Sequence, residues 1–144
     1  MEINVVQHTD EKVKVTIACR RVDDRIQKLK KHIALFDERI QAKKEKEVAF
    51  VEISQVLYFE VVDNRTFLYT QDDVMEVEAK LYELEMTLPE GEFVRSSKSQ
   101  MLNLNKVKSL RPELNRTIQV TMCNEEKLYI SRKYAPGIKK LLGI

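Results

Sequence analysis

The chain has few of the residues that mark special structural classes. Its 144 residues include no tryptophan, three glycines, three prolines, two cysteines and two histidines. Cys19 and Cys123 lie far apart in the sequence, with no further cysteine or histidine cluster beside either of them. This spacing favours neither a disulfide framework nor a zinc site, so a reducing compartment is expected.

Long hydrophobic runs are also missing. No run is longer than four residues, as in residues 48–51 and 56–59, and the apolar stretch near the N-terminus ends after Val6. A membrane helix needs about 20 apolar residues, and the core of a signal peptide needs about 7–15. The sequence therefore predicts neither feature, and the expected location is the cytoplasm.

Charge is abundant but unevenly distributed. The composition, 43% hydrophobic and 33% charged, is typical of one soluble globular domain, and the formal net charge is +2. Residues 1–46 carry twelve basic and eight acidic side chains, residues 47–94 two and twelve, and residues 95–144 eleven and three. The strongly basic final third is expected to attract polyanions in a salt-dependent way.

Signatures of enzymes are absent from the sequence. There is no glycine-rich nucleotide-binding motif, no serine-hydrolase motif and no zinc-protease motif. His8 and His32 are interpreted as surface residues, and the acidic residues of 76–85 alternate with apolar ones, as solvent-facing positions do. We therefore predict a protein that is not an enzyme, without a cofactor, a metal or a small-molecule substrate.

The first 46 residues are expected to form a strand-strand-helix extension. Residues 2–7 and 12–18 are rich in Val, Ile and Thr and resemble two strands of a hairpin. A helix is predicted next, from Val22 to Ile40, because apolar residues recur at spacings of three and four: Val22, Ile26, Leu29, Ile33, Phe36 and Ile40. This apolar stripe packs either within the chain or against a second copy in a homodimer.

From residue 47 to residue 144 the pattern indicates a mainly β domain. Short segments rich in β-branched and aromatic residues alternate with polar turns, which is typical of antiparallel strands. One short helix is expected at residues 80–88 because Leu81, Leu84 and Leu88 share a helical face, and an amphipathic turn is expected at 138–142. Strands are expected at residues 47–51, 55–62, 66–70, 74–78, 93–95, 101–104, 107–110, 117–122 and 127–130.

Basic and polar side chains gather in the predicted loops. Residues 95–100 read RSSKSQ, residues 131–134 read SRKY, and Arg116 follows Pro112 in another turn. In the acidic middle third, the turn at residues 63–65 carries an arginine. Guanidinium, ammonium, hydroxyl and amide groups are the donors that bind phosphates and base edges of nucleic acids.

These motifs, taken in order, resemble the LytTR-type DNA-binding domain of bacterial transcription regulators. The resemblance covers nearly all of residues 47–144. It begins with ISQVLYFE at 53–60, TFLYT at 66–70 and KLYELE at 80–85, and continues with FVRSSKSQMLNLNKV at 93–107 and LYISRKY at 128–134. The segment 93–107 is the most distinctive of these matches.

The resemblance implies a mainly β, overall α+β fold of about ten short strands in three small antiparallel sheets with one short helix. It further implies a sequence-specific regulator that inserts loops into successive major grooves of double-stranded DNA at promoter repeats. By motif position, the residues expected to read bases are Arg65, Lys98 and Arg132. The residues expected to contact the DNA backbone or to support the base-reading residues are Asn64, Arg95, Ser97, Ser99, Arg116 and Lys133.

The chain departs from the usual family layout at its N-terminal side. Such domains commonly follow a phosphoacceptor domain of more than a hundred residues, whereas about 46 residues precede the match here. The resemblance therefore implies the stand-alone branch, with control by a small regulatory membrane protein. The alternative is a non-catalytic interaction module whose helix and acidic segment bind a partner protein.

Overall fold

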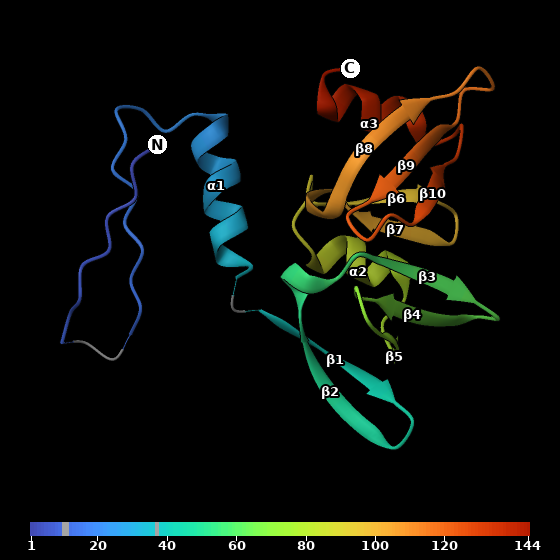
Figure 1. Ribbon diagram of the computed structural model, residues 1–144, viewed down its shortest axis with the longest axis horizontal. Helices are drawn as coiled ribbons and strands as arrows, with labels where there is room; N and C mark the ends of the chain where they lie inside the picture. Colours follow the sequence, from blue (N-terminus) through green and yellow to red (C-terminus); the bar gives the residue numbers. More distant parts are fainter. Residues whose placement is uncertain (10–11, 37) are drawn as a thin grey trace.

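The computed structural model describes residues 1–9, 12–36 and 38–144. The described residues form ten strands and three α-helices (Figure 1). The helices are α1 (Asp24–Ala34), α2 (Leu81–Thr87) and α3 (Ala135–Leu142). The strands are β1 (Arg39–Lys44), β2 (Glu47–Glu52), β3 (Tyr58–Val62), β4 (Arg65–Tyr69), β5 (Val74–Val77), β6 (Phe93–Ser97), β7 (Gln100–Asn103), β8 (Val107–Pro112), β9 (Ile118–Met122) and β10 (Lys127–Ile130).

The mainly β fold is confirmed, but its strands form two sheets instead of three. One sheet has the order β2-β1-β5-β4-β3-β7-β6, the other has the order β10-β9-β8, and all the pairs are antiparallel. The larger sheet is continuous because β3 pairs with both β4 and β7, and because Lys43 of β1 pairs with Glu76 of β5. These joining pairs connect distant segments, so local sequence patterns do not indicate them.

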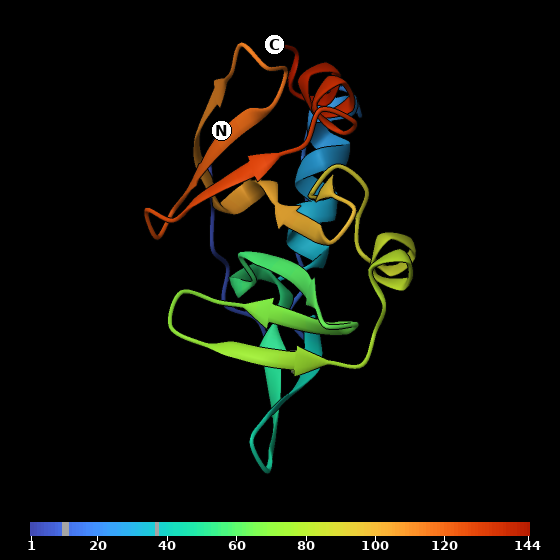
Figure 2. The same cartoon turned by 90° about the vertical axis from the view of Figure 1, so that its right-hand side faces the viewer.

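Strands β3 and β7 form the central layer between two hydrophobic cores. Phe59 and Met101, which are opposite each other in the sheet, enter the core that α2 covers with Leu81 and Leu84. The next pair, Tyr58 and Leu102, belongs to the second core, which β9, β10 and α3 complete. Figure 2 shows β6, β7 and then β3 in the middle of the strand region, with α3 and β8–β10 above them and β4 and β5 below. Alternating side chains of β3 and β7 thus fix both strands from two sides.

The short helices follow their apolar spacing. In α2, Leu81 and Leu84 are buried, and Leu88, the residue after the helix, is buried as well. Helix α3 begins three residues before the predicted amphipathic turn, because Pro136 fits the first turn of a helix. It buries Ala135 and Ile138 and ends at Gly143, where φ is +73°. The helical segments predicted around residues 80–88 and 138–142 are therefore present.

The predicted N-terminal hairpin was wrong. Residues 1–9 and 12–23 contain no strand, and residues 10 and 11 of the expected turn lie outside the described residues. Val5 and Val13 are 93% and 90% exposed, and none of the described residues before α1 is buried. A hairpin needs an apolar surface to pack on, because two strands alone are marginally stable in water.

The helix predicted from Val22 to Ile40 is shorter than expected. Asp23 caps it by accepting a hydrogen bond from the Ile26 N–H (3.1 Å), which places Val22 before the helix, and α1 ends at Ala34. Phe36 is 70% exposed, and Ile40 lies in β1, opposite Val51. Strand pairing with β2 thus overrides the helical period beyond residue 38.

Candidate nucleic-acid interface

The predicted turn at residues 63–65 is a two-residue hairpin connection. Val62 pairs with Arg65, so Asp63 and Asn64 alone span the turn between β3 and β4. Their φ angles are +52° and +60°, and Asp and Asn tolerate this left-handed region better than most residues. The turn presents Asn64 to solvent and makes Arg65 the first residue of β4.

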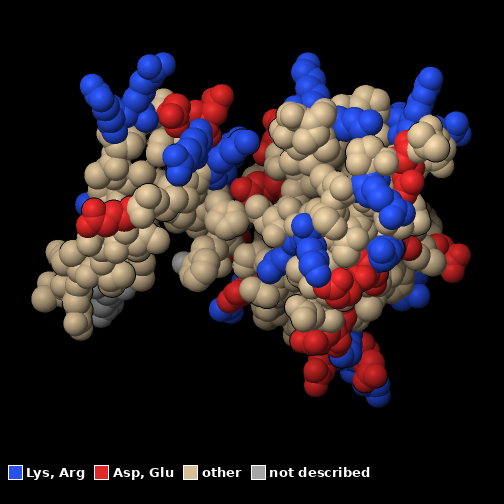
Figure 3. All heavy atoms as spheres, turned by 45° about the horizontal axis from the view of Figure 1, so that its top comes forward, with Lys and Arg blue, Asp and Glu red and all other residues tan. Residues whose placement is uncertain are grey.

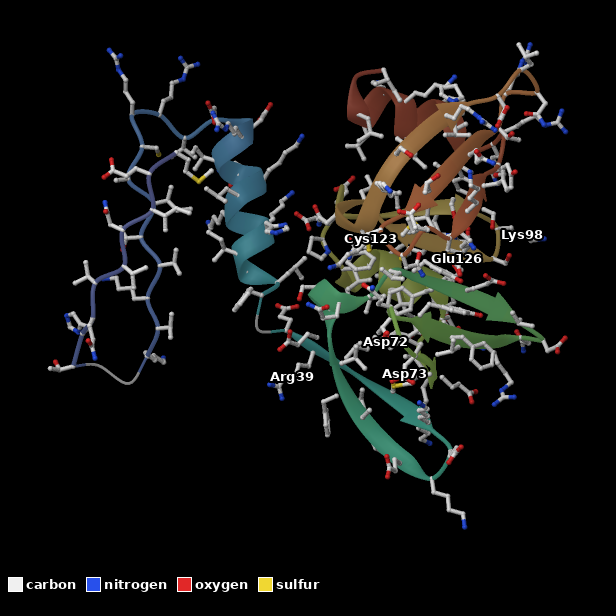
Figure 4. The ribbon with its side chains drawn as sticks, in the orientation of Figure 1. Arg39, Asp72, Asp73, Lys98, Cys123 and Glu126 are labelled. Carbon is white, nitrogen blue, oxygen red and sulfur yellow. The ribbon has the colours of Figure 1, made fainter. Side chains whose placement is uncertain are left out.

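The segment predicted as a loop at residues 95–100 is mostly strand. Arg95, Ser96 and Ser97 belong to β6, Gln100 begins β7, and only Lys98 and Ser99 form the turn. Ser96 is fully buried, and its hydroxyl donates to Gln100 Oε1 (2.9 Å). Because this hydrogen bond satisfies the buried hydroxyl, β6 can continue through a polar stretch of sequence. Figure 4 shows Lys98 beyond the strands, pointing away from the body of the protein.

Backbone hydrogen bonds bring three predicted DNA-reading segments to one edge. The Val61 N–H donates to the Ser99 carbonyl (2.8 Å), which sets the β3–β4 turn beside the β6–β7 turn. The Ser131 N–H donates to the Ser96 carbonyl (2.7 Å), which sets the residues after β10 beside β6. Both hairpin turns extend to the right in Figure 1, and this side faces the viewer in Figure 2.

The smaller sheet places Arg116 toward the same edge. Ile118 pairs with Ile130, so the β8–β9 turn and the residues after β10 lie at one end of this sheet. The φ of Arg116 is +70° in this turn. We call the whole surface the basic edge; its residues are Asn64, Arg65, Ser97, Lys98, Ser99, Arg116, Arg132 and Lys133.

The basic residues of this edge differ in whether their charged groups are already paired. Lys98 and Arg132 are exposed, and no ion pair or side-chain hydrogen bond within the described residues involves their charged groups. Lys133 lies over the Tyr134 ring, with its Nζ 5.5 Å from the centroid. In Figure 3, basic side chains spread over the upper part of the region formed by the strands, and acidic side chains gather in its lower part. Lys98 and Arg132 are therefore the basic residues of this edge that are best placed to bind an anionic partner.

Arg65, in contrast, is held by a carboxylate. Its Nε and Nη2 donate to the two oxygens of Glu76 at 2.9 and 2.5 Å, and its guanidinium lies 5.3 Å from the centroid of the Phe67 ring. These hydrogen bonds lower the pKa of the Glu76 carboxyl, so Glu76 remains ionised at neutral pH. The Arg65 side chain is nevertheless 59% exposed.

Arg95 stabilises the β6–β7 turn through hydrogen bonds to its backbone carbonyls. Its Nε donates to the Ser97 carbonyl (3.2 Å) and its Nη2 to the Lys98 carbonyl (2.5 Å). A third hydrogen bond joins Nη1 to Glu85 Oε1 of α2 (3.1 Å), and the side chain is 17% exposed. Arg95 therefore acts locally as a support for the turn that carries Lys98.

Arg95→Ala is expected to loosen this turn. The substitution leaves two turn carbonyls without their charged donor, which costs about 1–3 kcal/mol of unfolding free energy. Amide hydrogen exchange should accelerate by at least about tenfold relative to the wild type at Ser99, whose N–H donates to Ser97 Oγ, and at Val61, whose N–H donates to the Ser99 carbonyl. Arg111→Ala is the matched control, because Arg111 pairs with Glu113 on an exposed strand. Equal exchange rates at Val61 and Ser99 in all three proteins would exclude a supporting role for Arg95.

The partners of these arginines were not recognised from sequence. Glu76 and Glu85 were interpreted only as solvent-facing residues of an acidic run, yet each binds an arginine that belongs to or supports the basic edge. The pairing of Phe67 with Glu76 sets Arg65 and Glu76 diagonally across β4 and β5. The tight turn at residues 71–72, closed by the Thr70 N–H donating to the Asp73 carbonyl (2.9 Å), was the signal that could have indicated this register.

The described ranges contain neither a membrane-spanning helix nor a metal-binding cluster. No helix there has the length and hydropathy that a membrane crossing requires. No group of three or more His, Cys, Asp or Glu side chains within those ranges is arranged to hold a metal ion. Cys19 and Cys123 are both free and exposed.

Comparison with known proteins identifies the family. The LytTr DNA-binding domain model matches residues 46–143. A Staphylococcus aureus protein described as an uncharacterized HTH-type transcriptional regulator is 33% identical over 100 residues, which cover 69% of this chain and 67% of the relative. A second S. aureus protein with that description is 32% identical over the same shares.

A solved structure agrees with this match. The LytTr DNA-binding domain of a Bacillus cereus response regulator superposes with a TM-score of 0.72 at 29% identity, covering 75% of this chain and 99% of that chain. In the described part of the present chain, strands separate each helix from the next, so no two consecutive helices form a helix-turn-helix pair. The family match covers more than half of the sequence, including both hairpin turns and the segment after β10. The chain belongs to the LytTr DNA-binding domain family.

Proposed function

We propose that this protein is a sequence-specific DNA-binding transcription regulator. The single observation that carries the proposal is the basic edge, where hydrogen bonds join three predicted DNA-reading segments of a chain matched by a DNA-binding family model. The relatives named as transcriptional regulators support the same reading.

In this proposal the two hairpin turns and the segment after β10 enter the major groove. A two-stranded ribbon fits the major groove, which is about 12 Å wide, and lysine and arginine bind the O6 and N7 acceptors of guanine there. We assign base contacts to Lys98, Arg132 and Arg65. Contacts with phosphates are assigned to Ser97, Ser99, Lys133, Arg116 and Asn64, and Arg95 supports them through the turn.

The central layer explains why hairpin tips can serve as precise reading elements. The turns at 63–64 and 98–99 extend from β3 and β7, whose side chains enter the two cores. Phe59, Met101 and Leu102 are fully buried. A binding group mounted on a rigid element loses less conformational entropy when it meets its target.

Sequencing the genomic fragments that the purified protein retains tests this proposal. A shared sequence motif should emerge, and affinity for it should fall linearly with salt on a double-logarithmic plot, with a slope of about −0.9 per phosphate contacted. A duplex with the motif scrambled is the control. Retention of no fragments at low salt, together with capture of a partner protein, would favour the alternative of an interaction module.

We further propose that residues 1–46 form an extension that contacts a second copy of this chain. Ile26, Leu29 and Ile33 share one side of α1 and remain half-exposed. This apolar helix face is therefore only partly covered, which supports a contact with a second copy. A regulatory membrane protein would act on the same extension. Light scattering should give a dimer mass for the wild type and a monomer mass for Leu29→Lys. A monomeric wild type would contradict the dimer.

A further inference from the structure

Glu76 lies on the exposed face of the larger sheet, beside one of the residues assigned to base reading. We propose that Glu76 is a positioning residue: it holds Arg65 so that the outer edge of the guanidinium faces the DNA, and it thereby sharpens the preference at one base pair. This inference rests on the proposed function and adds to it a specificity-determining residue from the acidic segment.

Glu76 occupies only one side of the Arg65 guanidinium. The carboxylate binds Nε and Nη2, one on each oxygen, at 2.9 and 2.5 Å. An arginine has five N–H donors, so both N–H groups of Nη1 and one of Nη2 remain available. These remaining donors lie along the end of the side chain, and that end forms the fork that binds guanine O6 and N7 together. The ion pair therefore leaves the base-reading edge open.

The Arg65 side chain is held on two sides, by Phe67 and by Glu76. Phe67 and Glu76 are directly opposite each other in β4 and β5, and Arg65 is two residues before Phe67 on the same face. The guanidinium lies over the Phe67 ring while it binds the Glu76 carboxylate. An arginine that is already ordered before binding loses less rotamer entropy when it meets a base.

The Arg65–Glu76 pair differs from the other exposed ion pairs in the described residues. Lys43 and Glu78 make one contact of 3.4 Å, with the Glu78 side chain 89% exposed. Arg111 uses two nitrogens but binds a single oxygen of Glu113. Within the described ranges, the Arg65–Glu76 pair alone joins two nitrogens to both oxygens of one carboxylate, which defines the orientation of the guanidinium plane.

A positioning role for Glu76 predicts different effects on sequence specificity and on general affinity for DNA. Neutralising Glu76 removes a negative charge near the duplex, so non-specific binding should rise, as it should for any nearby carboxylate. The loss of orientation should act only on the base pair that Arg65 contacts. A role in stability alone would change the melting temperature without changing the base preference.

The test compares Glu76→Gln with Glu78→Gln and Arg65→Ala. Glu78 is two residues along on the same side of the sheet and lacks contact with Arg65, so its neutralisation controls for charge. Affinities are measured for a duplex selected from a random library by the wild type, and for each of its single base-pair variants. Arg65→Ala should reduce discrimination at one position by about 5- to 100-fold. Glu76→Gln should reduce it at the same position by about 2- to 10-fold, and Glu78→Gln should leave it unchanged.

The outcomes distinguish the inference from the proposed function. If the wild type selects no duplex, or Arg65→Ala keeps full discrimination, the function assigned to Arg65 fails first. If Arg65→Ala loses discrimination while Glu76→Gln retains it, the positioning role alone is overturned. A solution measurement without DNA adds a second check, because the NMR signal of the Arg65 Nε–H should be protected from exchange in the wild type and not in Glu76→Gln. Equal exchange in both proteins would also overturn the inference.

Discussion

The Lys98→Ala/Arg132→Ala double variant is expected to lose about 2–6 kcal/mol of binding free energy for its cognate duplex. Each side chain is exposed and unpaired among the described residues, so neither must leave an internal partner before it meets a base. A good base contact is worth about 1–3 kcal/mol, and two contacts from separate segments should add. Titration of a labelled duplex by fluorescence anisotropy measures this loss.

The matched control also removes one arginine and one lysine, but from the other end of the larger sheet. Arg39 begins β1 and Lys46 lies in the β1–β2 turn, both exposed, and Figure 4 shows Arg39 far from Lys98. Arg39→Ala/Lys46→Ala should weaken specific binding only slightly, because it reduces only the general electrostatic attraction between the protein and DNA. If the two double variants lose equal affinity, Lys98 and Arg132 contribute only net charge, and their assignment as base readers is wrong.

Phe59→Ala is expected to lower the free energy of unfolding by about 3–5 kcal/mol. Phe59 is fully buried in the core under α2, with its ring 6.0 Å from the Phe93 ring. It lies on β3 opposite Met101 of β7, and both side chains enter the core under α2, so the cavity would open beneath the two strands that carry the hairpin turns. Urea denaturation followed by circular dichroism measures the change.

Phe50→Ala is the matched control for this truncation. Phe50 lies in β2 and is 65% exposed, so its removal should change stability by about 0.5 kcal/mol or less. Equal destabilisation by Phe59→Ala and Phe50→Ala would contradict the placement of the core under α2. DNA affinity of Phe59→Ala should fall as well, because loss of packing loosens both turns at once.

The sequence predicted best those elements whose signal is local. Strands β2 to β10 were all expected within a few residues, because period-two patterns and polar turns mark each of them. Leu81, Leu84 and Leu88 likewise indicated the face that α2 buries. The order of the basic turns along the chain was visible too, so the basic edge follows once β3 lies beside β7.

Features that depend on how strands pair were not predicted from hydropathy. The residues of the expected N-terminal hairpin have suitable β-propensity but no apolar surface to cover, and Ile40 follows the helical period although it pairs in β1. Ser96 is polar and yet fully buried, because its hydroxyl bonds to Gln100 across the hairpin. The two hydrogen bonds between Arg65 and Glu76 follow from the register of β4 and β5, which hydropathy does not encode.

The most direct test of the account is an NMR titration of the backbone amides with the duplex that the wild type selects. The central claim is that the basic edge faces the DNA, so the largest shift changes should fall at residues 63–65, 97–99 and 131–133. Amides of β1, β2 and α1 should change little, because these elements lie away from that edge (Figure 1). Changes centred on α1 or on the β1–β2 hairpin, with the three turns unaffected, would contradict it.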